Sequence, residues 1–137
     1  MINVIGLGYI GLPTALMMAS HGVEVVGTDY NKKLVDTLNA GHTTFKEDGL
    51  DELFNAAVKA GIKEGLEGLA GKIPGLLEVR VYTDALPSSA NADLMLDTTF
   101  TDAAALKGYS THPAHVAVAD GKVRPYTAVR TCLDFNV

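Results

Sequence analysis

The chain has 137 residues, a length at which one domain, or two small ones that share a core, is expected. Hydrophobic residues make up 47% of it and charged residues 20%, which is typical of a globular core and excludes a disordered chain. The 11 Lys and Arg against 16 Asp and Glu give a net charge of −5, with no basic cluster, so a nucleic-acid partner is not expected. Glycine is in excess, with 14 residues.

The N-terminal stretch is uncharged up to Glu24 and could be mistaken for a leader peptide or a membrane anchor. It has no basic start, and Gly6, Gly8, Gly11 and Pro13 interrupt its apolar residues. We therefore expect no membrane segment here. The single cysteine, Cys132, fits a reducing cytoplasm, and we expect it to be a buried structural thiol.

The first 40 residues alternate between strand and helix patterns. Apolar runs predict strands over 2–7 and 23–28, and helical spacing predicts a helix over 12–20. Asn31 is expected to cap a second helix that ends near Asn39. This order of elements is typical of a parallel α/β unit.

A third helix is predicted from Leu50 to about Leu69. Gly61, Gly65 and Gly68 lie inside this pattern, and each disfavours a helix by about 1 kcal/mol relative to Ala. We therefore expect the helix to break near Gly61.

The remaining residues carry an antiparallel α+β pattern. Helices are predicted at 102–109, with Thr101 as the cap, and within 112–120. Strands are predicted at 77–83, 93–100 and 129–135.

Residues 6–11 (Gly-Leu-Gly-Tyr-Ile-Gly) match the pattern G-x-G-x-x-G between a predicted strand and a predicted helix. In a dinucleotide-binding unit Gly6 permits the tight turn, Gly8 lets a pyrophosphate approach, and Gly11 lets the helix pack on the strand. Asp29 ends the next strand, 23 residues after Gly6, where a carboxylate accepts the ribose hydroxyls of NAD. The alternative is a βαβ unit in which these glycines serve packing alone.

The same segment resembles the opening of the nucleotide-sugar 6-dehydrogenases, such as the UDP-N-acetylmannosamine and UDP-glucose dehydrogenases. The resemblance extends over residues 1–62 and includes the runs 4–15, 27–31 and 49–53. It implies that the ADP half of NAD is held by Gly6, Gly8, Tyr9, Ile10, Gly11 and Asp29.

Members of that family oxidise an alcohol twice through a catalytic cysteine that lies in later domains. Cys132 does not lie in a motif of that kind. We therefore expect a nucleotide-binding protein rather than a complete dehydrogenase.

From about residue 62 onward the chain resembles the stress-responsive dimeric α/β-barrel (Dabb) proteins. The matching runs are 69–76, 92–96 with Phe100, 105–109, 112–116 and 133–135. This resemblance implies a ferredoxin-like sheet and a homodimer in which two such sheets pack face to face.

A cyclase branch of the Dabb proteins closes polyketide rings with a tyrosine and a histidine at positions that match Tyr109 and His115. A phenol beside an imidazole is a plausible acid–base pair for an enolisable carbonyl. The alternative is that His112 and His115 cap the short helix and only satisfy hydrogen bonds.

These patterns divide the chain into a Rossmann-like segment, 1–61, and a Dabb-like segment, 62–137. Each is incomplete, so we expect them to share one sheet, with a strand from 2–6 or 23–28 completing the C-terminal sheet. Three functions remain open: a nucleotide-binding and dimerisation module, a cyclase or isomerase, and a structural chimera or stress-response protein without a ligand.

Overall fold

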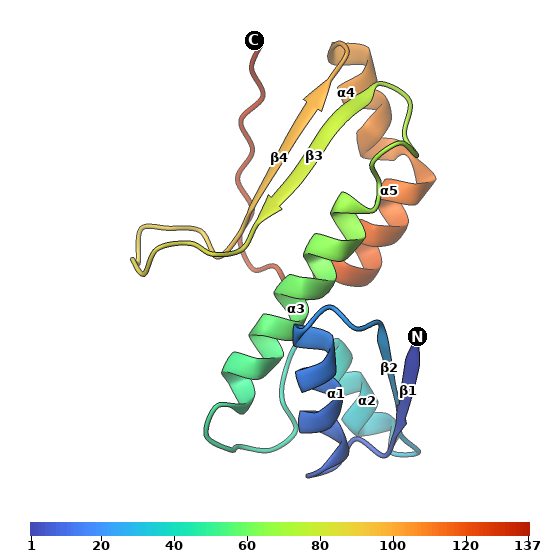
Figure 1. The fold of residues 1–137 in the computed structure, drawn as a ribbon, viewed down its shortest axis with the longest axis vertical. Helices are drawn as coiled ribbons and strands as arrows, with labels where there is room; N and C mark the ends of the chain where they lie inside the picture. Colours follow the sequence, from blue (N-terminus) through green and yellow to red (C-terminus); the bar gives the residue numbers. More distant parts are fainter.

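The computed structural model describes residues 1–137, which form two lobes at opposite ends of one long helix (Figure 1). The N-terminal lobe contains β1 (Ile2–Ile5), α1 (Gly11–Ser20), β2 (Val25–Thr28) and α2 (Lys32–Asn39). The long helix is α3 (Leu50–Glu67). The C-terminal lobe contains β3 (Leu76–Tyr82), β4 (Met95–Phe100), α4 (Ala103–Thr111), α5 (Pro113–Val118), a π-helical turn η1 (Ala119–Val123) and a 3₁₀ turn η2 (Arg124–Tyr126).

The N-terminal lobe is a two-stranded parallel sheet with α1 packed on one face. The strands pair in register from Ile2 opposite Val25 to Ile5 opposite Thr28. The opposite face is uncovered, since Ile5 is 80% exposed and Val26 is 45% exposed. The elements follow one another as β1, α1, β2 and α2, so the predicted strand–helix–strand–helix order is confirmed.

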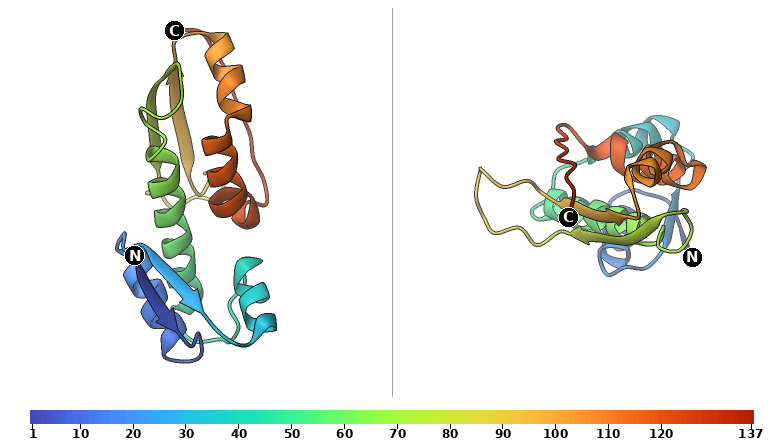
Figure 2. Two further views of the ribbon diagram at one scale, coloured as in Figure 1. Left: turned by 90° about the vertical axis from the view of Figure 1, so that its right-hand side faces the viewer. Right: turned by 90° about the horizontal axis from the view of Figure 1, so that it is seen from above.

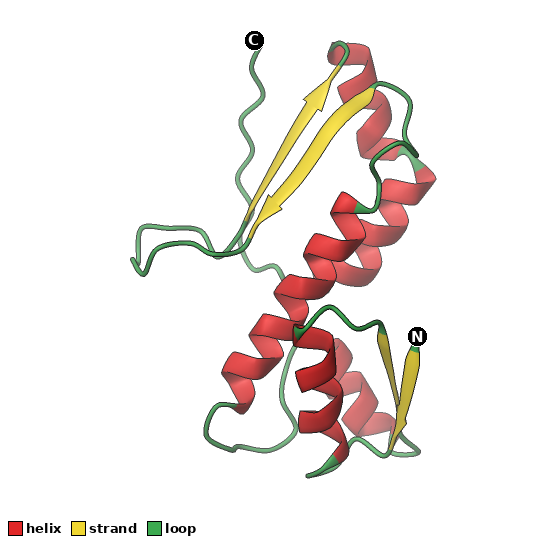
Figure 3. Cartoon of the chain, in the orientation of Figure 1, coloured by secondary structure: helices red, strands yellow, loops and turns green.

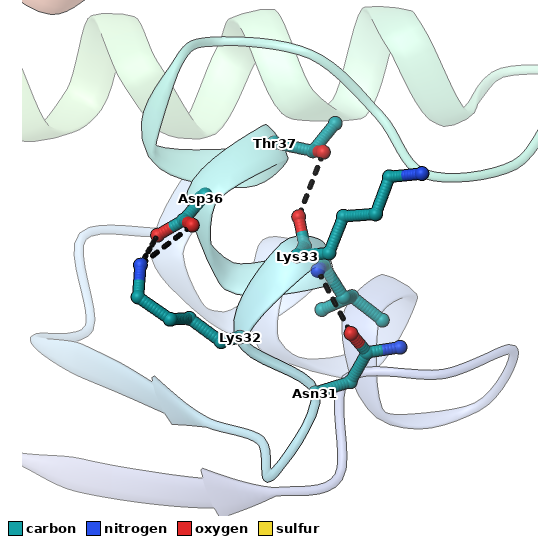
Figure 4. A network of polar contacts seen from close by, with 6 residues as sticks. Asn31, Lys32, Lys33, Asp36 and Thr37 are labelled. Atoms are coloured by element: carbon teal, nitrogen blue, oxygen red, sulfur yellow. Dashed lines mark hydrogen bonds and ion pairs between the residues drawn. The ribbon is translucent and has the colours of Figure 1, made fainter.

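Helix α2 begins where the sequence predicts, because Asn31 caps it (Figure 4). The Asn31 side-chain oxygen accepts a hydrogen bond from the backbone N–H of Leu34 at 3.3 Å. The ammonium group of the next residue, Lys32, forms an ion pair with Asp36, one turn along the helix, at 2.7 Å. Both contacts can be predicted from the sequence, because they join residues three and four positions apart in a helix.

The C-terminal lobe is an antiparallel hairpin of β3 and β4 covered on one face by helices (Figures 1 and 2). The inward side chains of β3, Leu76, Val79 and Val81, are buried. They form a core with Leu69, Ile73 and Tyr109 and with the C-terminal half of α3.

Helix α3 joins the two cores through residues spaced four apart. Leu50 and Phe54 belong to the N-terminal core, and Ile62 and Leu66 belong to the C-terminal core. Val58, between them, packs against both cores. The expected break near Gly61 is wrong, because α3 is continuous and burial on both sides of Gly61 outweighs the low helix propensity of one glycine.

The expected shared sheet is also wrong. The chain has two separate two-stranded sheets, one at each end of α3, and no strand of the first pairs with the second (Figure 3). The two lobes pack on opposite ends of α3, so the strands β1 and β2 do not reach the strands β3 and β4.

Two local predictions for the C-terminal segment fail. Helix α4 is capped by Asp102, whose carboxylate accepts a hydrogen bond from the N–H of Ala105 at 2.8 Å, and not by Thr101. The predicted strand at 129–135 is absent, and residues 127–137 contain no regular secondary structure. None of the helices combines the length and the apolar character that crossing a bilayer requires.

Two glycines of α3 test how this helix packs. A Cβ at Gly61 would meet no atom within 4 Å, so we expect Gly61→Ala to raise the free energy of unfolding by about 0.5–1 kcal/mol. A Cβ at Gly65 would come within 2.9 Å of a methyl carbon of Val118, so Gly65→Ala should lower it. Urea unfolding of both variants checks this, and equal effects would contradict the packing of α3 on α5.

Candidate functional site

The glycine loop, residues 6–11, has the backbone geometry of a phosphate-binding turn. Gly6 has a φ of +87°, a conformation that residues with a side chain rarely adopt. A Cβ at Gly11 would overlap the carbonyl oxygen of Gly6. Only a glycine at this position allows the start of α1 to pack directly against the backbone of the loop. A Cβ at Gly8 would meet nothing within 4 Å, which leaves the space in front of the loop open.

Free hydrogen-bond donors line the loop. The backbone N–H groups of residues 8–11 donate no hydrogen bond within the chain. The first residue before α1, Ile10, supplies no side-chain cap to the helix. Unpaired N–H groups at the positive end of a helix favour an anion, so this loop fits the pyrophosphate of a dinucleotide.

Asp29 follows β2 and lies beside the glycine loop. One carboxylate oxygen accepts the N–H of Leu7 at 2.7 Å, and the other accepts the N–H of Asn31 at 2.8 Å. The bonds from Asn31 and Leu7 hold the pKa of Asp29 below its usual value. Each oxygen keeps a further acceptor site, so the carboxylate can also bind hydroxyl groups.

Tyr9 and Ile10 project from the loop, with 67% and 82% of their surfaces exposed. The Tyr9 ring stacks on Phe45 from the α2–α3 loop, with ring centroids 4.9 Å apart. Phe45 was not predicted as a site residue, because its segment reads as a polar loop and the contact spans 36 residues of chain. The glycine loop is thus supported from a second segment.

The structure also contains a cavity of 440 Å³ between α1, β2, α2, α3 and η1. Its walls are mostly apolar and include Leu16, Val25 and Phe54. Leu7 of the glycine loop contributes to one wall, but Gly8 and Asp29 do not line the cavity, so it does not include the open space in front of Gly8.

Tyr109 and His115 come together in the C-terminal lobe. Their ring centroids lie 4.1 Å apart, and Phe100 packs on the other side of Tyr109 at 5.2 Å. The Tyr109 Oη and the His115 Nδ1 are buried and have no hydrogen-bond partner. His112, by contrast, caps α5 by accepting the N–H of Ala114 at 3.2 Å, so the capping alternative holds for this histidine.

Burial moves the pKa values of the pair apart. It raises the pKa of the Tyr109 phenol and lowers the pKa of the His115 imidazole. A hydrogen bond to the backbone of Ser110 and the charge of Asp120 raise the pKa of His115, the charges of Arg124 and Arg130 lower it, and the net shift is downward. At neutral pH the pair therefore consists of a neutral imidazole that can accept a proton and a phenol that can donate one.

Cys132 is exposed, so the prediction of a buried thiol is wrong. The closing strand that would have buried it is not formed. Its Sγ donates a hydrogen bond to an Asp134 oxygen at 3.3 Å, and this bond raises the pKa of the thiol. No three His, Cys, Asp or Glu side chains are grouped so that they could hold a metal ion.

The fold and the two sites define a protein with a βαβ dinucleotide-type lobe and an α+β lobe. The family model described as "UDP-glucose/GDP-mannose dehydrogenase family, NAD binding domain" matches residues 1–67, and "Stress responsive A/B Barrel Domain" matches residues 43–137. The chain belongs to the stress responsive A/B barrel family. Both resemblances seen in the sequence are confirmed, and the two matches overlap across α3.

The similar curated proteins are nucleotide-sugar dehydrogenases. An NDP-N-acetyl-D-galactosaminuronic acid dehydrogenase of Ralstonia nicotianae is 53% identical over 60 residues, 44% of this chain and 14% of that protein. The UDP-N-acetyl-D-mannosamine dehydrogenase of Escherichia coli K12 is 38% identical over 104 residues, 76% of this chain and 23% of that protein. The chain thus spans less than a quarter of the length of either relative.

Among solved structures, the UDP-N-acetyl-mannosamine dehydrogenase Cap5O from Staphylococcus aureus is 45% identical, with a TM-score of 0.42. The match covers 44% of this chain and 15% of that one.

The partly buried imidazole of His115 predicts a pH dependence of stability. The pKa of His115 is lower in the folded chain than its unfolded value of about 6.5, so the unfolded state binds the proton more tightly. The stabilisation is complete above pH 6.5 and is lost as the pH falls toward the folded pKa. Urea unfolding at several pH values should show this loss, and His115→Phe should reduce it. An identical pH dependence in both proteins would contradict a lowered pKa of His115.

Proposed function

We propose that the N-terminal lobe binds the ADP half of NAD. The observation that carries this proposal is the open space at Gly8 in front of four unpaired backbone N–H groups. In this proposal residues 8–11 hold the pyrophosphate by backbone donors, and Asp29 accepts the adenosine ribose hydroxyls. Tyr9 and Ile10 flank the nucleotide, and Phe45 supports Tyr9 from the side.

The choice of NAD over NADP rests on the charge of Asp29. A carboxylate beside the ribose repels a 2′-phosphate, and the lowered pKa of Asp29 keeps it ionised across the physiological range. NAD supplies hydride chemistry from its nicotinamide, and the residues named here concern the other half of the molecule.

Gly8→Ala tests the binding site without changing the fold. The added methyl group meets no protein atom, but it enters the space proposed for the pyrophosphate. We expect calorimetric titration with NAD and with ADP-ribose to show at least about tenfold weaker binding, a loss of about 1.4 kcal/mol. Gly61→Ala adds the same methyl group in open space away from the loop and should bind like the natural chain.

Two results would contradict the proposal. If the natural chain released or absorbed no heat at millimolar NAD, NAD binding would be excluded. The result would favour a structural chimera or a stress-response protein without a ligand. Equal affinities of Gly8→Ala and Gly61→Ala would show that the ligand binds elsewhere.

We further propose that the C-terminal lobe forms a homodimer through the outer face of the β3–β4 sheet, in a cytoplasmic protein. Glu78, Arg80 and Tyr82 project from this face, and Glu78 and Arg80 form an ion pair at 2.5 Å. Tyr82 is 47% exposed and supplies an amphipathic ring of the kind enriched in interfaces.

The exposed thiol of Cys132 fits a reducing compartment, which supports the proposal of a cytoplasmic protein.

A second candidate function is a cyclase or isomerase that uses Tyr109 and His115. The unpartnered Tyr109 Oη and His115 Nδ1 favour it, because buried polar atoms without partners are uncommon in structural roles. In this function the imidazole removes a proton next to a carbonyl, and the phenol donates one to the developing enolate oxygen.

This candidate predicts that His115→Gln and Tyr109→Phe each lower turnover of an enolisable polyketide analogue at least about a hundredfold. His112→Gln is the matched control, since His112 caps α5 and should affect stability alone. Equal turnover in His115→Gln and His112→Gln would exclude the acid–base role.

A further inference from the structure

The 440 Å³ cavity between α1, β2, α2, α3 and η1 is much larger than a packing defect. Side chains in a protein core normally interdigitate and leave few spaces larger than a water molecule. Binding sites for small molecules, in contrast, have volumes of about 300–1,000 Å³ and mostly apolar walls. The cavity has both of these properties.

Two helices form walls of small and apolar side chains. Ala15 and Leu16 of α1 line the cavity and are buried. Helix α3 contributes Phe54, Ala57 and Gly61. A Cβ at Gly61 would meet no atom within 4 Å, so the protein leaves the space beside this residue open.

Helix α2 forms another wall and packs loosely. Of its eight residues only Leu38 is buried, and the half-buried Val35 also lines the cavity. Helix α2 makes no extended contact with another helix or strand. A ligand in the cavity would therefore give the apolar side of α2 a surface to pack on.

The free edge of β2 brings backbone polar groups to the cavity. Residues 23–27 all line it, and because successive side chains of a strand point to opposite faces, it is the edge of the strand that borders the space. At the other edge, the N–H of Ile2 donates to the carbonyl of Glu24 at 2.8 Å, so the even-numbered residues of β2 bond to β1. The N–H and carbonyl groups of Val25 and Gly27 point to the free edge, where no strand pairs with them.

The charged side chains that line the cavity are already paired. Lys122 of η1 forms an ion pair with Glu64 of α3 at 3.3 Å, and Glu24 lies 3.7 Å from the N-terminal amine of Met1. An ionised ligand would leave water without a free opposite charge to meet it, which is costly. The charges therefore favour a neutral ligand.

The volume of the cavity indicates the size of that ligand. An apolar cavity of about 150 Å³ holds one benzene ring, and this cavity is about three times as large. Two or three rings would fill it.

We propose that this cavity binds a neutral, mainly apolar compound of two or three rings that carries one hydrogen-bond donor. The rings occupy the space between α1, α2 and α3, and the donor binds the free carbonyl of Val25 or Gly27 at the edge of β2. The site is distinct from the proposed NAD site, because Gly8 and Asp29 do not line the cavity.

Two dyes with the same rings test the class of ligand. N-phenyl-1-naphthylamine is neutral, has three aromatic rings and one N–H donor, and fluoresces more strongly in apolar surroundings. We expect it to bind the full chain saturably, with one dye per chain. 1-Anilinonaphthalene-8-sulfonate adds one sulfonate to the same rings and should bind at least about tenfold more weakly. Equal or tighter binding of the sulfonate, or no saturable binding of the neutral dye, would overturn the proposal.

A matched pair of glycine variants tests the location. Gly61→Leu fills the cavity from α3 and should weaken binding of the neutral dye at least about tenfold. Gly108→Leu is the control, because Gly108 lies in α4, away from the cavity, and a Cβ there also meets no atom within 4 Å. Both changes replace a helical glycine and should make the chain more stable to urea. Equal affinity of the two variants for the dye would overturn the proposal.

The natural chain provides a test that is independent of any variant. Nuclear Overhauser effects should connect the ring protons of the neutral dye to the methyl groups of Leu16, Val25 and Val35. Contacts to methyl groups of the C-terminal lobe alone would overturn the proposal. Displacement of the dye by ADP-ribose would show that the cavity is part of the nucleotide site, and would overturn a separate ligand. Failure of NAD to bind would not change the expected dye binding.

Discussion

The apolar row along α3 is the contact on which the rest of the structure depends. Five apolar side chains, each four residues apart, form a row that winds gradually around the helix, because 3.6 residues make one turn. Residues four apart in a helix lie above one another, so this row presents a continuous surface about as long as the helix. The first two contact the N-terminal lobe, the last two contact the C-terminal lobe, and Val58 contacts both. Helix α3 packs on α1 in the N-terminal lobe and on β3 in the C-terminal lobe, and a two-stranded sheet is stable only when helices pack on it.

This arrangement also explains why two family descriptions overlap on the same residues. The match to the NAD-binding domain ends at residue 67 and the match to the barrel domain begins at residue 43, so both include α3. One helix can satisfy both descriptions, because its N-terminal half packs as the last helix of one unit and its C-terminal half as the first helix of the other. The cores remain distinct, and the sites in the two lobes are chemically separate.

Local chemistry accounts for the parts of the fold that could be predicted. The glycine loop and the Asn31 cap are specified by residues a few positions apart. The break at Gly61 was predicted for the same local reason, and it fails because packing at Ile62 and Leu66 stabilises the helix more than glycine destabilises it. At the glycine loop, the pattern identifies Gly11 and Asp29, but Phe45 comes from a segment without any periodic signal.

The sequence by itself determined the type and order of the elements, the glycine loop and the resemblance to two families, because each depends on spacing along the chain. Only the tertiary structure decided which edges are paired. The strand pattern at 129–135 is real, yet a strand forms only where another backbone accepts its hydrogen bonds, and no edge of this chain does so. For the same reason Cys132 is exposed and the two sheets remain separate, since pairing depends on where α3 places each lobe.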